Sequence, residues 1–208
     1  MTFPALLRTL PACCGRLAAA ATLAALLPHG ADAAGWSPQE TVAPYAIDGQ
    51  TGIDLYRSIG EKGPAIGPTR AIAHTTFKLT WRRDYQQRGA DCVLASAVPK
   101  LVITYTLPKP RRKLTGEVAV RWKTFIDGIA AHERVHGADI IAMVRAIERE
   151  SVGLTAVNDP GCRKIRQDLT ERLGRLSNEQ RAKSRAFDQV EMSDGGNVQR
   201  LILALVAP

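Results

Sequence analysis

The sequence has few aromatic residues, and this scarcity limits the partners that it can recognise. Aromatic residues make up 5% of the 208-residue chain, and none of them interleave the basic runs as base-stacking platforms would require. We therefore expect no nucleic-acid partner, although the chain carries a net charge of +8. Positive charge also favours contact with anionic polymers or membrane surfaces. Anionic envelope polymers are thus one class of partner that the composition allows.

The chain also lacks an apolar run long enough to span a bilayer, which takes about 20 residues. The unbroken run of Leu, Ala and one Thr over Leu17–Leu27 is too short, follows two arginines and precedes an A-x-A pattern at Ala31-Asp32-Ala33. This order predicts a secretory signal peptide over residues 1–33, with an uncleaved anchor as the alternative. We expect an exported protein, periplasmic or secreted, whose residues 34–208 form one domain of about 175 residues without a transmembrane segment.

Cysteine is scarce as well, and its distribution predicts a disulfide. Two of the four cysteines fall within the predicted signal peptide, so the mature chain keeps Cys92 and Cys162. An even pair in an oxidising compartment favours a disulfide, and two free thiols are the alternative. The bond would close a loop of about seventy residues, which stabilises the fold by roughly 4 kcal/mol in the chain-entropy model.

The mature chain has only three histidines, and two of them lie in one motif, His132-Glu133-Arg134-Val135-His136. The motif reads H-E-x-x-H within a segment of helical periodicity, so both imidazoles lie on one helix face and can bind one metal ion. Glu133 is rotated by about 100° from His132 and can reach a metal-bound water without being a ligand. This arrangement is typical of a zinc hydrolase with Glu133 as the general base. The alternative is a helix with two partly buried histidines and a surface glutamate.

The region after the motif contains further candidate residues. Gly137 follows the second histidine and allows a chain segment or a substrate to approach closely. Asp139 lies three residues after His136, where its carboxylate is either a hydrogen-bond acceptor that orients a ligand histidine or an ordinary surface charge. Carboxylates and glycines gather over residues 187–196, which we expect to form a loop that supplies the third ligand or a solvated turn.

Hydrophobic periodicity predicts an α+β fold with a small antiparallel sheet, a long helix that carries H-E-x-x-H and a second amphipathic helix. The strongest strand signal is strict alternation over residues 71–82. The expected strands are 43–48, 71–82, 92–97 and 101–107, and the expected helices are 51–59, 116–152 and a third that begins at Cys162. The apolar run 201–206 is expected to form a last strand or a packed tail.

With these residues in view, the chain resembles a bacterial family of unknown function that is described as predicted secreted zinc-dependent proteases. The resemblance covers nearly all of the mature chain and is most specific at the H-E-x-x-H motif. The other shared positions are Tyr45, Gly49, Gly63-Pro64, Thr75, Trp81, Cys92, Thr106-Leu107-Pro108, Trp122, Cys162 and Phe187-Asp188. It implies a zinc-dependent peptidase with a zincin-like domain.

The resemblance also predicts where the third zinc ligand differs. The family pattern ends with tyrosine-aspartate, a threonine and a histidine-glycine, and this chain has Phe187-Asp188, Glu191 and Ser193 at those positions. Because carboxylate binds zinc as well as imidazole does, we expect Asp194 to replace the missing histidine, with Asp188 as the substitute.

Three functions are compatible with these residues. The first is an exported zinc-dependent metallopeptidase that hydrolyses peptide bonds in a peptide or protein substrate. The second is a catalytically silent module that keeps the fold and binds the cell envelope. The third is a cell-wall metallo-amidase, which would perform the same chemistry on a peptidoglycan amide.

Overall fold

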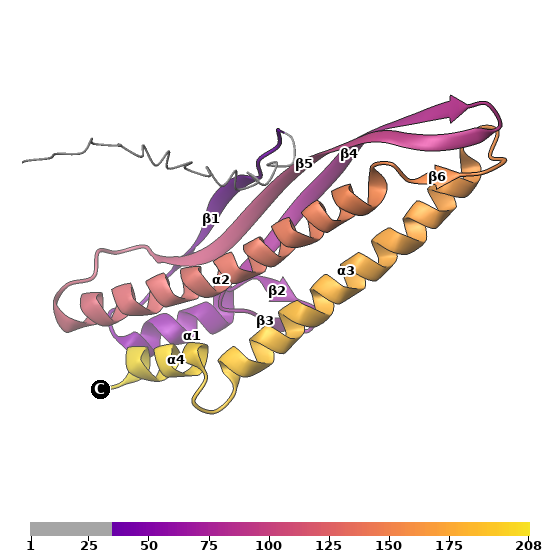
Figure 1. Cartoon of the computed structure of the whole chain (residues 1–208). Coiled ribbons are helices and arrows are strands. Elements are labelled where there is room, and N and C mark those ends of the chain that lie inside the picture. The colour runs from indigo at the N-terminus through magenta and orange to yellow at the C-terminus, as the bar shows by residue number, and fades with distance from the viewer. Residues whose placement is uncertain (1–34) are drawn as a thin grey trace, which may run out of the picture. The chain divides into compact units, whose positions relative to one another are not determined.

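The computed structural model describes residues 35–208, and Trp36–Pro208 form one compact unit. The signal peptide expected over residues 1–33 lies outside the described residues. Within these residues, no helix is both long enough and apolar enough to cross a membrane. The unit combines a small sheet with four helices (Figure 1), so the α+β prediction is confirmed.

The main sheet has the strand order β1 (Gln39–Ile47), β5 (Asp91–Pro110) and β4 (His74–Arg88), with β6 (Thr155–Ala156) paired to one end of β5. β4 and β5 are antiparallel and form a long hairpin. The hairpin turns at Gly89, whose φ of +62° lies in the left-handed region that favours glycine. A separate two-stranded sheet joins β2 (Ala65–Ile66) to β3 (Thr69–Arg70).

Two sequence expectations about the sheet are wrong. β1 runs parallel to β5, so the sheet is mixed rather than antiparallel. The chain leaves β1 through helix α1 (Gly52–Lys62) and the β2–β3 pair before it enters β4 on the opposite edge of β5, and such a crossover permits parallel pairing. β5 also continues through Pro99, because β1 pairs only with the Val102–Pro110 part of β5 and leaves the proline beside a free edge.

The central helix, α2 (Gly116–Ser151), lies along one face of the sheet and carries the H-E-x-x-H motif (Figure 1). Its buried residues pack against β5 in a core that contains Ile103, Ile140 and Val144. A Cβ at Gly137 would lie 2.1 Å from the hydroxyl of Tyr105 on β5. Glycine therefore allows the close helix–sheet approach that the sequence indicated.

The C-terminal segment contains more helix than the sequence predicted. Helix α3 (Arg163–Met192) runs beside α2 and includes residues 187–192, which were expected in a loop. No proline interrupts the chain between Cys162 and Met192, so the helix continues to Met192 and ends just before Gly195 and Gly196. The run 201–206 is likewise not a strand but part of helix α4 (Asn197–Val206), which packs against α1 and α2. Its inward residues recur at helical spacing: Val198, Leu201, Ile202 and Leu205.

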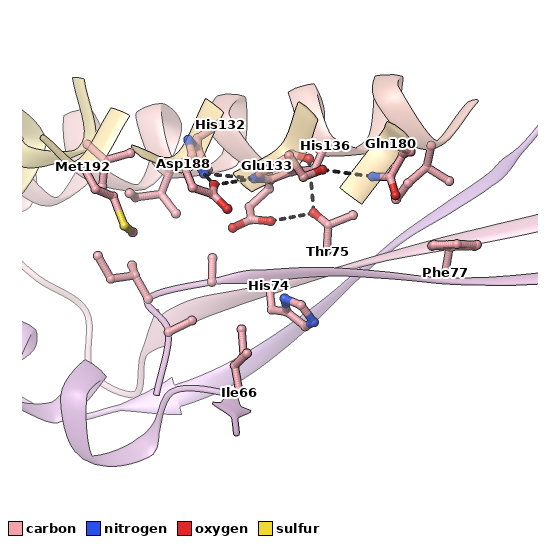
Figure 2. A pocket seen from close by; sticks show the side chains of 17 residues that line it. Ile66, His74, Thr75, Phe77, His132, Glu133, His136, Gln180, Asp188 and Met192 are labelled. Atoms are coloured by element: carbon pink, nitrogen blue, oxygen red, sulfur yellow. Dashed lines mark hydrogen bonds and ion pairs between the residues drawn. The ribbon is translucent and has the colours of Figure 1, made fainter. Parts of the chain in front are cut away.

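The predicted disulfide is confirmed, since Cys92 of β5 is bonded to Cys162, the residue before α3. Both cysteines belong to a small core with Leu94, Ile165 and Leu169. The bond therefore ties the start of α3 to the far end of the long hairpin. The other end of α3 lies beside the H-E-x-x-H motif (Figure 2).

Candidate metal centre

The two histidines of the motif converge as their helical spacing predicted. The Nε2 atoms of His132 and His136 lie 3.2 Å apart. His132 is 6% exposed and the side chain of His136 is 12% exposed, so water screens neither ring strongly. Ile129 and Ile140, one turn before and after, are buried in the core and fix this helix face toward the sheet.

Asp188 of α3 joins the two histidines. Its Oδ1 atom lies 2.9 Å from Nε2 of His136 and 3.2 Å from Nε2 of His132. Figure 2 shows the carboxylate pointing from α3 toward both imidazoles. Among residues 35–208, these three side chains form the group whose possible ligand atoms all lie within 4.8 Å of one another.

The spacing of the three atoms fits one small cation. Tetrahedral zinc with bonds of about 2.0–2.1 Å separates its ligand atoms by roughly 3.4 Å, close to the 2.9–3.2 Å found here. Lone pairs that face one another at this distance repel unless a proton or a metal ion lies between them. A metal ion satisfies all three donors at once. Two imidazoles and one carboxylate are also a ligand set that catalytic zinc sites use, with a fourth position left open.

The aromatic ring of Phe187 packs against both imidazole rings. Phe187 stacks on His132 with centroids 4.8 Å apart and an interplanar angle of 21°. Its edge contact with His136 has a centroid distance of 5.5 Å and an angle of 80°. Because α3 extends through this residue, Phe187 and Asp188 are fixed on a helix rather than on a mobile loop. This packing restricts the imidazole orientations.

Glu133 is buried beside the histidines and is held by a strand residue. The Thr75 hydroxyl lies 2.5 Å from Glu133 Oε2 and 3.1 Å from the Glu133 carbonyl oxygen. The single hydroxyl hydrogen can be donated to either oxygen, and the carboxylate is the stronger acceptor. Thr75 lies on β4, so the sheet orients the carboxylate within the cavity. The alternating pattern of residues 71–82 revealed the strand but gave no sign of this polar role.

Asp194 and Asp139 lie away from the ligand group. Asp194 is exposed in the turn after α3 and accepts a hydrogen bond from Gln199 Nε2 at 2.9 Å. Asp188 occupies the position beside the histidines because α3 stays helical over that stretch. Asp139 accepts a hydrogen bond from Lys183 of α3 at 2.7 Å. Within residues 35–208 it has no hydrogen bond to either histidine, so it links two helices instead of orienting a ring.

A cavity of about 310 Å³ opens at the three candidate ligands and Glu133 (Figure 2). Apart from the candidate ligands and Glu133, its lining is mostly apolar and also includes the amide of Gln180 and the hydroxyl of Ser184, both on α3. His74 of β4, the remaining histidine of residues 35–208, also lines the cavity. The apolar lining residues are Ile66, Ala71, Ile72, Ala73, Phe77, Ile129, Ile140, Met192 and Val198.

Comparison with known families assigns the chain to a family but does not indicate an activity. The family model described as "Bacterial protein of unknown function (DUF922)" matches residues 42–196. The match includes both histidines, Glu133 and Asp188. No curated protein and no solved structure matches the chain. The geometry of the site is therefore the basis for its chemistry.

Proposed function

We propose that this chain, which belongs to the bacterial family of unknown function DUF922, is an exported zinc-dependent peptidase. The observation that carries the proposal is the convergence of His132, His136 and Asp188 beside Glu133 in the lining of one cavity. Three protein donors, one buried carboxylate that is not a donor and an adjacent cavity are the parts that a zinc hydrolase requires.

His132, His136 and Asp188 are the residues that would hold Zn²⁺. When bound, Zn²⁺ would acidify a water molecule and polarise the carbonyl of a peptide bond. The donor atoms come from two helices that are packed side by side, so little of the site has to be ordered when the ion binds. Phe187 limits the movement of both rings.

Glu133 acts as the general base and then as the general acid. Its carboxylate lines the cavity, so it can take a proton from a water molecule there and return it to the leaving amine. The Thr75 hydroxyl contacts only Oε2, and within residues 35–208 the other carboxylate oxygen accepts no hydrogen bond. The 5% exposure of Glu133 keeps bulk water from competing for that proton.

The cavity supports a substrate with an apolar side chain next to the scissile bond. Outside the candidate metal centre, most residues that line the cavity are apolar and none is Asp, Glu, Lys or Arg. Burying an aliphatic side chain there contributes about 1.5–3 kcal/mol, whereas a charged side chain would lose its hydration without gaining a partner. We therefore expect cleavage beside Leu, Ile, Val or Met rather than beside Lys, Arg, Asp or Glu.

Two features support export. Residues 1–33 have the pattern of a secretory signal peptide. The disulfide between Cys92 and Cys162 is the kind of bond that persists in oxidising compartments. Proteolytic activity that depends on zinc would then act on substrates outside the cytoplasm.

The test uses the mature chain with one equivalent of zinc, incubated with casein and with short apolar peptides. Glu133→Gln should bind zinc as the wild type does but lose activity by roughly 10²–10⁴-fold, the usual contribution of general acid–base catalysis. Glu171→Gln, at an exposed position on α3, is the matched control and should keep full activity. Equal rates for wild type and Glu133→Gln would refute the proposal. Peptidoglycan fragments in the same panel distinguish a peptidase from a cell-wall amidase.

A further inference from the structure

One ring nitrogen of the metal site has no partner that the proposed function explains. Nε2 of His132 faces Asp188 and His136, whereas Nδ1 lies on the other side of the ring. This Nδ1 atom is shielded from solvent and has no hydrogen-bond partner among residues 35–208. Its nearest ion-pair neighbour is Glu191, whose Oε2 lies 3.6 Å away.

Glu191 is held close to the histidine by the end of α3. Its side chain is 17% exposed, and its Oε2 accepts a hydrogen bond from Asn197 Nδ2 at 3.2 Å. Asn197 begins α4, directly after the turn that contains Gly196. A Cβ at Gly196 would lie 2.3 Å from the Glu191 carbonyl oxygen. Glycine therefore lets α4 begin close enough for Asn197 to hold the carboxylate.

Neutral histidine carries one N–H, on either Nδ1 or Nε2, and only the nitrogen without hydrogen can bind a metal. The Nε2 atom of His132 is the one that faces the ligand group, so its proton has to reside on Nδ1. A buried N–H without an acceptor is unfavourable. A carboxylate that accepts this N–H favours the required tautomer and fixes the ring.

We propose that Glu191 is the positioning residue for His132. It accepts the Nδ1–H after a small rotation of its side chain and keeps the Nε2 lone pair directed at the ion. This inference rests on the proposed zinc site but assigns a role to a residue that is neither ligand nor general base. It also gives a function to the Ser193–Gly196 turn, because the turn places Asn197 against Glu191.

The first test is zinc affinity, measured by competition with a chromophoric chelator on the mature chain. Glu191→Ala should raise the dissociation constant by roughly 10–100-fold, the usual effect of removing the acceptor behind a ligand histidine. Glu191→Gln should lie between the two, because its amide oxygen can accept the hydrogen bond without the charge. Asn197→Ala should weaken binding less than Glu191→Ala. The exposed Glu171→Ala on the same helix should bind as the wild type does.

The second test separates positioning from general loss of structure. Long-range ¹H–¹⁵N NMR of the zinc-loaded wild type should show His132 as a single Nδ1–H tautomer, with that signal shifted in Glu191→Ala while His136 is unchanged. Circular dichroism of the metal-free variants should match the wild type. Equal zinc affinity and an unchanged His132 signal in Glu191→Ala would overturn the inference.

The two proposals fail in different ways. A wild type that binds no zinc refutes the proposed function. The NMR spectrum of the metal-free protein then tests whether Glu191 accepts a hydrogen bond from His132 Nδ1–H. If Glu191 accepts the Nδ1–H, Glu191→Ala moves the His132 signals in that spectrum and Glu171→Ala does not. If neither variant moves them, Glu191 has no positioning role.

Discussion

We predict that the third zinc donor is Asp188 rather than Asp194. Asp188 Oδ1 lies 2.9–3.2 Å from both imidazole nitrogens, whereas Asp194 is exposed and accepts a hydrogen bond from Gln199. Asp188→Ala should therefore remove a donor, and Asp194→Ala should leave the donor set intact. Both variants lose one carboxylate near the end of α3, so the overall charge change is matched.

The expected magnitude follows from linkage between binding and folding. Zinc at 100 times its dissociation constant stabilises the folded chain by about 2.7 kcal/mol, which raises Tm by roughly 5–11 °C for a domain of this size. Loss of a donor should weaken binding at least as much as loss of an outer-shell partner, or about 100-fold. At the same zinc concentration, zinc would then stabilise the folded Asp188→Ala variant by only about 0.4 kcal/mol. This corresponds to a rise in Tm of roughly 1–2 °C.

The assay is differential scanning calorimetry of wild type, Asp188→Ala and Asp194→Ala, each with and without zinc. Wild type and Asp194→Ala should show the full zinc-dependent rise in Tm, and Asp188→Ala should lose most of it. The opposite result, with the rise lost in Asp194→Ala and kept in Asp188→Ala, would refute the reasoning. It would mean that the turn after α3 rearranges and supplies the donor that the sequence first indicated.

Three further predictions concern the surroundings of the site. Thr75→Val should lower kcat by roughly 10–150-fold and leave zinc affinity unchanged, since a hydrogen bond to a charged group contributes about 1.5–3 kcal/mol. Equal losses in both quantities would contradict a role confined to the general base. Gly137→Val should destabilise the fold by about 1–3 kcal/mol in urea titrations because it overpacks the helix–sheet contact. Gly174→Ala on α3 should not, because a Cβ added there would have nothing within 4 Å. Replacing Cys92 and Cys162 together by alanine should lower the free energy of unfolding by roughly 4 kcal/mol in the chain-entropy model, with zinc stoichiometry retained; a loss below 1 kcal/mol would mean that residual structure already restrains the unfolded chain.

Several parts of the fold could be predicted because their causes are local. The helix with the motif begins at Gly116 and ends at Ser151, close to the expected 116–152, because its apolar spacing persists over the whole length. Strict alternation predicted the core of β4, although the strand continues to Arg88. The path of the chain from β1 to β4 could not be predicted from local patterns of this kind. Parallel pairing of β1 with β5 depends on which edge of the sheet the chain returns to, and no local pattern encodes that edge.

The C-terminal errors have a different cause. Glycine and carboxylate residues near position 190 indicated a loop, yet the neighbouring α2 and α4 provide surfaces against which a continuous α3 packs. Tertiary packing commonly overrides weak local preferences in this way. The run 201–206 was short enough to fit either a strand or a helix, and only the wider spacing from Val198 to Leu205 distinguishes the two.

The sequence alone determined the part of the site that depends on one turn of helix. His132 and His136 meet because residues four apart on a helix share a face, and Glu133 lies beside them for the same reason. The sequence also predicted the disulfide partners, because only Cys92 and Cys162 lie outside the predicted signal peptide. Tertiary structure decided the rest. Asp188 is 52 residues from His136 and Thr75 is 58 residues from Glu133, so their contacts depend on how α3 and β4 pack against α2, which no local spacing specifies.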